Sequence, residues 1–169
     1  MMLQIGVIGS RATKNRKALA LARDVGKEIA RRGAVLVCGG LEGVMEAACE
    51  GAKSERGITV GILPGSDVRA ANKFVDIKIA TGMGWARNQA VALSSDGIIM
   101  IEGECGTLSE LCLAWAEGKP VVALATSGGY AEKFAGARVD EKREDKIHEA
   151  KNAREAIDKL SKLLKKKRR

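Results

Sequence analysis

The sequence predicts a doubly wound α/β fold, with a mostly parallel sheet of about six or seven strands and helices on both faces. Short apolar runs alternate with longer amphipathic segments along the chain, and this alternation specifies parallel strands joined by right-handed crossovers. Two glycine-rich loops, at residues 37–45 and 102–110, each follow an apolar run and precede a helical pattern. A length of 169 residues suits a single core, so we expect one domain over residues 1–169.

The first part of the chain contains three expected strands and two helices. Residues 3–8 form an apolar run, and residues 14–32 repeat apolar side chains at helical spacing until a glycine ends the pattern. Residues 34–37 form the second strand and lead into the first glycine loop, after which we expect a helix at 43–54. The third strand, residues 58–63, stops at a Pro-Gly pair.

The middle of the chain adds two strands and two helices. Residues 74–80 alternate apolar and polar side chains, as a strand does, whereas residues 85–95 have a helical pattern. The strand at 97–101 is apolar throughout and leads into the second glycine loop. The helix that follows, residues 107–117, ends before a Gly-Lys-Pro sequence.

The last part of the chain is less regular. A sixth strand at 121–125 precedes residues 126–145, for which the sequence predicts no definite element. A short strand near 146–148 and a helix from about Asn152 complete the chain. Six of the eight net positive charges lie in residues 160–169, which we expect to form a basic helical tail.

The basic tail has two interpretations. Cations at the C-terminal end of a helix interact favourably with its dipole, which would make the tail a solvated helix end. Alternatively, the tail makes a weak, salt-sensitive contact with a polyanion. Aromatic residues make up only 3% of the chain, so few side chains could stack on bases. Nucleic acid is therefore not expected as the main partner.

The cysteines and the lengths of the apolar runs indicate in which cellular compartment the protein is expected. Cys38, Cys49, Cys105 and Cys112 show no close paired spacing, and the chain contains one histidine. We therefore expect reduced thiols, with neither a zinc site nor a disulfide framework. No apolar run approaches the length that spans a membrane, and no basic segment precedes a long apolar stretch at the N-terminus. These features predict a cytoplasmic protein without membrane association.

The two glycine-rich loops are candidate anion sites. Glycines leave backbone N–H groups accessible, and the helix that follows points its partly positive end at the same place. In such folds, ligands bind beyond the carboxyl ends of the strands, where the strand order reverses. Ser10, both loops and residues 80–84 lie at strand ends of this kind. Glycines also serve tight turns, so a purely structural role for either loop stays open.

Three separated motifs carry a family resemblance. Residues 39–45 read Gly-Gly-Leu-Glu-Gly-Val-Met, Arg87 precedes a helix, and residues 103–110 follow the pattern Gly-x-x-Gly-Thr-x-x-Glu. With these motifs, residues 3–125 resemble the LOG-like family, also labelled "possible lysine decarboxylase", and especially its branch of molybdenum-cofactor carrier proteins. The 23-residue spacing from Arg87 to Glu110 also fits that family. The decarboxylase label is not adopted, because nothing in the sequence would hold a pyridoxal cofactor.

The resemblance implies a Rossmann-like fold that binds a nucleotide or nucleoside phosphate, usually as a homodimer or higher oligomer. Characterised members release the free base from a nucleoside 5′-monophosphate, so the first hypothesis is a protein that binds or hydrolyses a nucleoside-phosphate-type ligand. The second hypothesis is a non-catalytic carrier or sensor of a phosphorylated cofactor, either molybdopterin-like or a dinucleotide. The third is a structural oligomer whose site has decayed.

For a hydrolase, the resemblance assigns catalysis to Arg87 and Glu110. A carboxylate near the sugar would stabilise the positive charge that develops on ribose, while the guanidinium would hold phosphate or steady the leaving base. The expected ligand-binding residues lie in the two loops and at the end of the first strand: Gly9, Ser10, Gly39, Gly40, Gly43, Met45, Gly103, Gly106 and Thr107.

Structural alternatives to these roles stay open. Glu110 in the first turn of a helix would be favourable whatever the function, and Thr107 could be a helix cap. Arg87 could be an interface salt-bridge residue. Ser10 could close a turn, and Met45 could be core packing.

Three acidic residues depart from the family pattern. Glu102-Gly103-Glu104 stands where the family usually has Pro-Gly-Gly, and Glu42 lies in the first loop. A carboxylate 4 Å from a phosphate is repelled by about 1 kcal/mol in water, and by more where solvent is excluded. The acids could face outward, recruit a divalent cation, or shift the ligand toward a less anionic one. No other metal site is expected.

Apolar residues in two helices predict assembly. Trp85, Leu93, Leu111, Leu113 and Trp115 provide more apolar surface at residues 85–95 and 107–117 than one helix face against a sheet needs. We therefore expect a homo-oligomer, at least a dimer.

Overall fold

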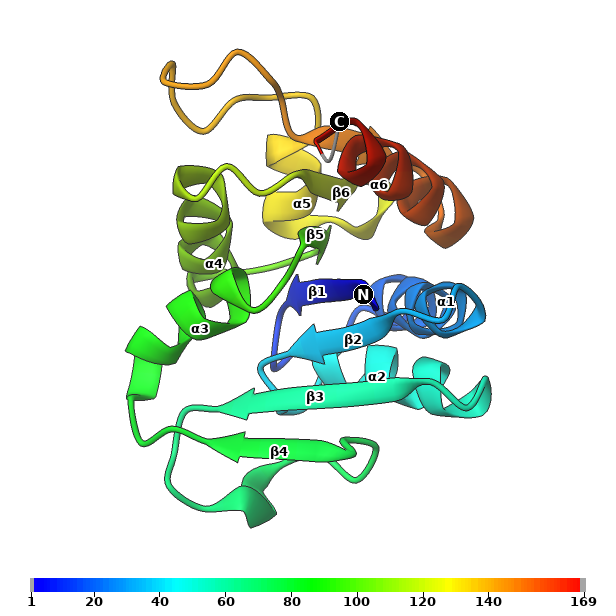
Figure 1. Cartoon of the computed structure of the whole chain (residues 1–169), viewed down its shortest axis with the longest axis vertical. Coiled ribbons are helices and arrows are strands. Elements are labelled where there is room, and N and C mark those ends of the chain that lie inside the picture. The colour runs from blue at the N-terminus through cyan, green and yellow to red at the C-terminus, as the bar shows by residue number, and fades with distance from the viewer. Residues whose placement is uncertain (1, 168–169) are drawn as a thin grey trace.

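The computed structural model describes residues 2–167 and contains one seven-stranded sheet, shown in Figure 1. The strand order is β4-β3-β2-β1-β5-β6-β7, and every neighbouring pair is parallel. The strands are β1 (Gln4–Gly9), β2 (Val35–Cys38), β3 (Ile58–Leu63), β4 (Ile77–Ala80), β5 (Gly97–Ile101), β6 (Val121–Leu124) and β7 (His148–Ala150). This arrangement confirms the predicted Rossmann-like α/β fold.

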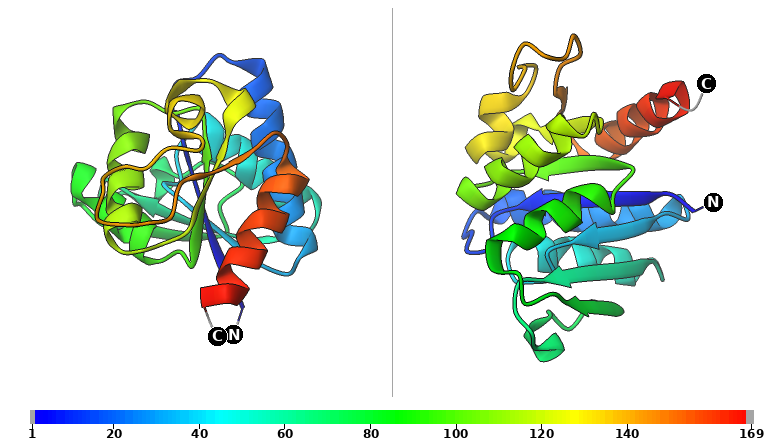
Figure 2. Two further views of the ribbon diagram at one scale, coloured as in Figure 1. Left: turned by 90° about the horizontal axis from the view of Figure 1, so that it is seen from above. Right: turned by 60° about the vertical axis from the view of Figure 1, so that its left-hand side comes forward.

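Helices cover both faces of the sheet (Figure 2). One face packs against α1 (Arg16–Arg31), α2 (Val44–Ser54) and α6 (Ala153–Lys167), and the other against α3 (Arg87–Leu93), α4 (Cys105–Ala116) and α5 (Gly129–Phe134). Successive strand residues point to opposite faces. In β1, Val7 therefore belongs to the core under α1 and α2, and Ile8 to the core under α3 and α4.

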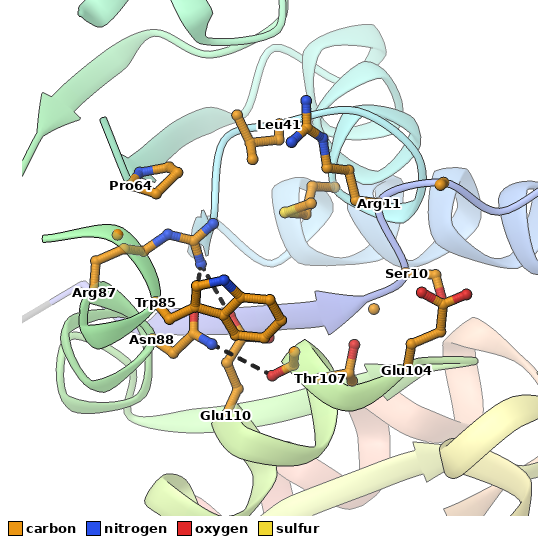
Figure 3. A pocket seen from close by; sticks show the side chains of 15 residues that line it. Ser10, Arg11, Leu41, Pro64, Trp85, Arg87, Asn88, Glu104, Thr107 and Glu110 are labelled. Atoms are coloured by element: carbon orange, nitrogen blue, oxygen red, sulfur yellow. Dashed lines mark hydrogen bonds and ion pairs between the residues drawn. The ribbon is translucent and has the colours of Figure 1, made fainter. Parts of the chain in front are cut away.

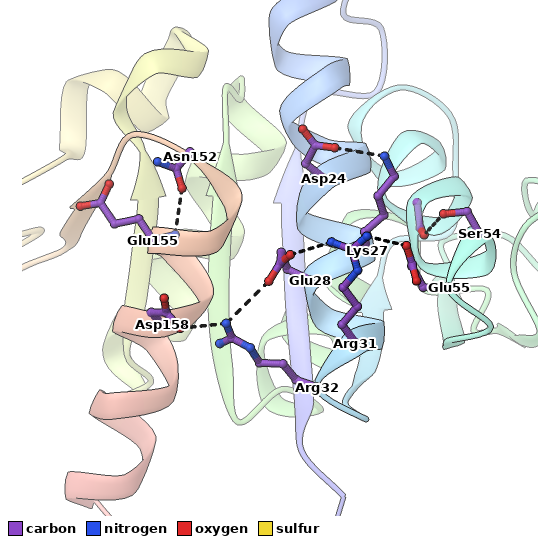
Figure 4. A network of polar contacts seen from close by, with 11 residues as sticks. Asp24, Lys27, Glu28, Arg31, Arg32, Ser54, Glu55, Asn152, Glu155 and Asp158 are labelled. Carbon is purple, nitrogen blue, oxygen red and sulfur yellow. Dashed lines mark hydrogen bonds and ion pairs between the residues drawn. The ribbon is translucent and has the colours of Figure 1, made fainter.

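Polar contacts fix the helices of the first face to one another (Figure 4). Arg31 Nη2 donates to Glu55 Oε1 at 2.7 Å, just beyond α2, and Arg32 Nη2 donates to Asp158 Oδ1 of α6 at 2.8 Å. The helix α1 begins at an Asn15 cap, whose Oδ1 accepts from the N–H groups of Lys17 and Ala18. Asn15 Nδ2 also donates to the carbonyl of Ser127 at 3.0 Å, which fixes the loop between β1 and α1 at the edge where the strands end.

Several boundaries differ from those expected. The strand expected at 74–80 is only Ile77–Ala80, because Asn72 folds the preceding residues into a turn in which its Oδ1 accepts from Phe74 N–H at 3.0 Å. The 3₁₀ turn Gly84–Ala86 precedes α3, so the α-helix itself begins at Arg87. The helix expected at 107 begins two residues earlier, at Cys105.

The undecided stretch 126–145 is held against the core by a stacked arginine. After the 3₁₀ turn Ala125–Ser127 and the helix α5, the chain forms a loop that returns to β7. Arg143 Nη1 donates to the carbonyl of Trp115 at 2.8 Å, and its guanidinium lies 4.1 Å from the centroid of the Trp115 ring. This contact explains how a segment with few apolar residues is fixed.

The basic tail is the end of α6. Leu160 and Leu164 are buried in the core, and Lys167 Nζ donates to the carbonyl of Gly118 at 2.9 Å. Arg168 and Arg169, which the tail prediction included, lie outside the described residues. Within residues 2–167, no helix combines the length and the apolar content needed to cross a membrane.

Exposed apolar side chains gather on β3, β4 and the end of α3. Ile58, Ile77, Ile79 and Leu93 are all exposed. The pairing of Val60 with Ile77 and of Ile62 with Ile79 places the three isoleucines on the sheet face that α3 and α4 cover farther along. Of the residues expected to drive assembly, Leu111 and Trp115 are instead buried in the core.

Candidate functional site

A cavity of ≈ 500 Å³ lies at the carboxyl ends of the central strands, between the two glycine loops. The sheet order reverses between β1 and β5, so the chain leaves these two neighbouring strands on opposite sides of the sheet. Predicted ligand-binding and catalytic residues that line the cavity are Gly9, Ser10, Met45, Arg87, Gly106, Thr107 and Glu110. Figure 3 shows Ser10, Thr107 and Glu104 at one end and Arg87, Asn88 and Glu110 at the other.

The glycines of the first loop lie behind the cavity wall and contact residues that line it. Gly39, Gly40 and Gly43 do not line the cavity. A Cβ on Gly39 would lie 2.5 Å from Arg87 Nη2, so the bare backbone here is what lets the guanidinium lie against the loop. Val44 N–H donates to the carbonyl of Ser10 at 3.0 Å, which ties this loop to the end of β1. Met45 both packs in the core and lines the cavity.

The second glycine loop presents the N-terminus of α4 to the cavity. Glu104 occupies the N-cap position of this helix with extended backbone, and no side chain accepts a hydrogen bond from the first turn. The N–H groups of that turn therefore have no side-chain acceptor, an arrangement that is able to bind an anion. Gly106 and Thr107 line the cavity at this point, while Gly103 belongs to a second cavity on the other side of the loop.

Arg87 and Glu110 form a buried pair at the far end of the cavity. Arg87 Nη1 lies 3.4 Å from Glu110 Oε1, and the two residues are only 7% and 6% exposed. Burial raises the pKa of Glu110 to about 7, although the charge of Arg87 opposes this shift. Burial also lowers the pKa of Arg87. Glu110 lies beyond the first turn of α4, so it is not a cap of that helix.

Asn88 is a site residue that the sequence did not reveal. Its Oδ1 accepts from Arg87 Nη1 at 2.8 Å, and its Nδ2 donates to Ser109 Oγ of α4 at 2.7 Å. It is buried and lines the cavity. The sequence feature that could have indicated Asn88 is its position directly after Arg87, in the short helix α3.

Two buried donors in the cavity have no hydrogen-bond partner. Within the described part of the chain, the buried side-chain polar atoms without a partner are Ser10 Oγ, Arg87 Nε and Glu102 Oε2. Ser10 and Arg87 line the cavity. A buried donor left unpaired costs about 1–3 kcal/mol, so such atoms are uncommon, and both are able to donate to a molecule in the cavity.

The three acidic residues occupy different surroundings. Glu42 pairs with Arg11 at 2.7 Å on the surface, and Glu102 Oε1 accepts from Thr13 Oγ1 at 2.9 Å. Glu104 lines the cavity. Over residues 2–167, no group of three carboxylate, cysteine or histidine side chains could hold a metal ion, so these acids do not form one cluster.

A family model matches residues 2–157 of this chain, and it describes the SLOG cluster4 family. The chain belongs to the SLOG cluster4 family. An uncharacterised protein of Archaeoglobus fulgidus is 47% identical over 123 residues, which cover 73% of this chain and 80% of that protein.

Two further likenesses confirm the predicted resemblance to LOG-like proteins and molybdenum-cofactor carriers. The cytokinin riboside 5′-monophosphate phosphoribohydrolase of Mycobacterium tuberculosis is 39% identical over 113 residues, which cover 62% of this chain and 60% of that enzyme. The solved structure of the Moco carrier protein from Chlamydomonas reinhardtii superposes with a TM-score of 0.84 at 37% identity, over 98% of this chain and 99% of the carrier.

The raised pKa of Glu110 predicts a measurable dependence of stability on pH. The folded protein binds this proton more tightly than the unfolded chain, so the stabilisation is full below the ordinary pKa of 4.5 and is lost as the pH rises to about 7. Replacing Glu110 by Gln removes this titration. The free energy of unfolding of Glu110→Gln minus that of wild type should therefore increase by about 3 kcal/mol between about pH 4 and pH 8.

Urea denaturation at a series of pH values measures this difference. Glu117→Gln, a change at an exposed residue just after α4, is the matched control and should follow wild type. Parallel curves for Glu110→Gln and wild type would show that Glu110 is ionised with an ordinary pKa.

Proposed function

We propose that this protein binds a nucleoside 5′-phosphate, or a similar phosphorylated ligand, in the cavity between the glycine loops. The observation that carries this proposal is the pair of buried donors without partners, Ser10 Oγ and Arg87 Nε, in a cavity closed by the uncapped N-terminus of α4. Hydroxyl and backbone N–H donors at a helix N-terminus suit a phosphate. We place the phosphate near Ser10, Gly106 and Thr107, and the sugar toward Glu110.

The proposed reaction is hydrolysis of the N-glycosidic bond. Water adds at C1′ of ribose while the base leaves with the bonding electrons and takes up a proton, giving free base and ribose 5-phosphate. Ionised Glu110 stabilises the positive charge that develops on the sugar and orients the water. Arg87 offers a free N–H on Nε for the ligand, while its Nη1 is held by Asn88.

Carriage of a phosphorylated cofactor is the second candidate function. The likeness to the Moco carrier protein extends over 98% of this chain, which favours this alternative. The same donors, Ser10 and the first turn of α4, fit the phosphate group of a molybdopterin-like cofactor. Such a carrier would need no catalytic use of Glu110.

Nucleotide assays with two variants distinguish the enzyme from the carrier. Wild type is expected to bind at least one of AMP, GMP and CMP in calorimetry, and to release its base in a chromatographic assay. Glu110→Gln should lower turnover by about 10²-fold or more with little change in affinity, because its charge matters chiefly in the transition state. Arg87→Lys, which keeps the charge but loses the planar fork, should weaken both binding and turnover.

Glu117→Gln on the surface should leave turnover and affinity unchanged. Binding without release of base from any nucleotide would establish the carrier in place of the enzyme. The absence of any nucleotide binding would contradict the proposed function as a whole.

Gly106 offers a separate test of the phosphate position. A Cβ at this residue would meet only the Trp85 ring, at 3.6 Å and 3.9 Å, which is ordinary contact. Alanine favours a helix over glycine by up to about 1 kcal/mol, so Gly106→Ala should keep or raise the melting temperature. The added methyl group should nevertheless weaken AMP binding, because it lies where we place the phosphate. Unchanged AMP affinity in this variant would place the phosphate elsewhere.

Assembly into a homo-oligomer is also part of the proposal. The exposed isoleucines Ile58, Ile77 and Ile79, with Leu93, form an apolar surface that a second copy would cover. Trp85 is left out of this surface because it lines the cavity.

Light scattering at tens of micromolar protein tests the assembly. Wild type should be a dimer or larger, and Ile77→Lys combined with Ile79→Lys should be a monomer with an unchanged circular dichroism spectrum. Ala20→Lys, at an exposed residue of α1 on the opposite face of the sheet, is the control and should assemble like wild type. A monomeric wild type would refute the proposed interface.

A further inference from the structure

A second cavity, of ≈ 440 Å³, adjoins the first across the second glycine loop. Trp85, Glu104 and Gly106 line both cavities. The far wall of the second cavity comes from α5, through Tyr130 and Lys133. The two cavities therefore meet at the N-terminus of α4, which is the position assigned above to the phosphate.

The second cavity gathers the aromatic rings that are available to a ligand. The chain contains five aromatic residues, two Trp, one Tyr and two Phe, and two of them line this cavity. Trp85 is 72% exposed, although a large apolar ring of this kind is usually buried. Phe74, Trp115 and Phe134 pack against the core. Tyr130 is half-buried, with its ring centroid 6.1 Å from that of Phe134, and also lines the cavity. Exposed aromatic faces stack well on planar heteroaromatic rings.

A cation accompanies these rings. Lys133 Nζ lies 5.1 Å from the centroid of the Tyr130 ring. No salt bridge joins this ammonium to a carboxylate in the described part of the chain, so its charge is available to an anion. The Glu104 carboxylate at the junction can accept hydrogen bonds from sugar hydroxyls.

We propose that the second cavity is a subsite for the second half of a two-part ligand, a dinucleotide in which two nucleosides are joined through a pyrophosphate. One nucleoside occupies the first cavity, the pyrophosphate lies at the N-terminus of α4 within reach of Lys133, and the second base stacks on Trp85 and Tyr130. This subsite rests on the proposed function, because the first half of the ligand is the nucleoside phosphate assigned there. A mononucleotide fills only the first cavity.

Calorimetry with AMP and with diadenosine diphosphate tests the subsite. Stacking of the second base should make diadenosine diphosphate bind wild type about tenfold more tightly than AMP. Tyr130→Ala should remove that advantage and leave AMP affinity unchanged, while Tyr130→Phe should keep it. Lys133→Ala should also weaken diadenosine diphosphate selectively, and Lys162→Ala, on the exposed side of α6, is the control.

The outcomes separate the two proposals. Equal affinity of wild type for both probes, or equal loss of both probes in Tyr130→Ala, would overturn the subsite and leave the first cavity as proposed. Binding of diadenosine diphosphate that depends on Tyr130, without any binding of AMP, would support the subsite and refute a mononucleotide function. If neither probe binds, both proposals fail. If Trp85→Ala dissociates an oligomer without changing dinucleotide affinity, Trp85 belongs to an interface and the subsite is wrong.

Discussion

The buried contact between Arg87 and Glu110 is the interaction on which the geometry of the site depends. It joins α3 to α4, and through the Gly39 carbonyl, 3.4 Å from Arg87 Nη2, it reaches the end of β2. A separation of 3.4 Å is longer than the 2.7–2.9 Å typical of a tight charge-assisted bond. Burying two charges is costly, and a pair of this kind is weak evidence for stability. The pair matters for chemistry instead. It places a carboxyl group with a pKa near neutrality beside a guanidinium whose Nε–H has no partner.

The topology supplies the rest of the arrangement. β1 and β5 are neighbours in the sheet although they are far apart in the chain, so Ser10 and the second glycine loop meet at the same edge. The first loop follows β2, and the Arg87 guanidinium lies directly against its Gly39. Ser10 and the first turn of α4 therefore lie on segments that emerge from the buried strands β1 and β5. Arg87 instead follows the exposed edge strand β4, and its side chain lies against the first loop.

The sequence predicted the fold well because the strands that matter are strongly patterned. Residues 97–101 are apolar throughout, and β5 is buried at every position. Element ends were harder to predict. The cap of α4 is the extended backbone of Glu104, which leaves no recognisable side-chain signal, so the helix was placed two residues late.

The composition of the site was predictable in part. The resemblance to the LOG-like family indicated Arg87 and Glu110, and the structure places them together. The raised pKa of Glu110 could not be read from spacing, because it arises from burial by residues distant in the chain. The need for glycine at position 39 depends on where the Arg87 side chain lies. Asn88 was missed since an asparagine in a short helix shows its function only through its partners on α4.

The two tryptophans differ in exposure, and this difference makes one of them a fluorescent probe of the cavities. Trp115 is buried, its Nε1 donates to Asp140 Oδ1 at 2.9 Å, and a guanidinium lies over its ring, so its surroundings stay constant. Trp85 stands 72% exposed on the wall shared by both cavities. Indole emission depends on the polarity around the ring, so a small molecule that lies against Trp85 is expected to change the emission of this residue and not that of Trp115. The protein thus carries a native optical probe on the wall that the two cavities share.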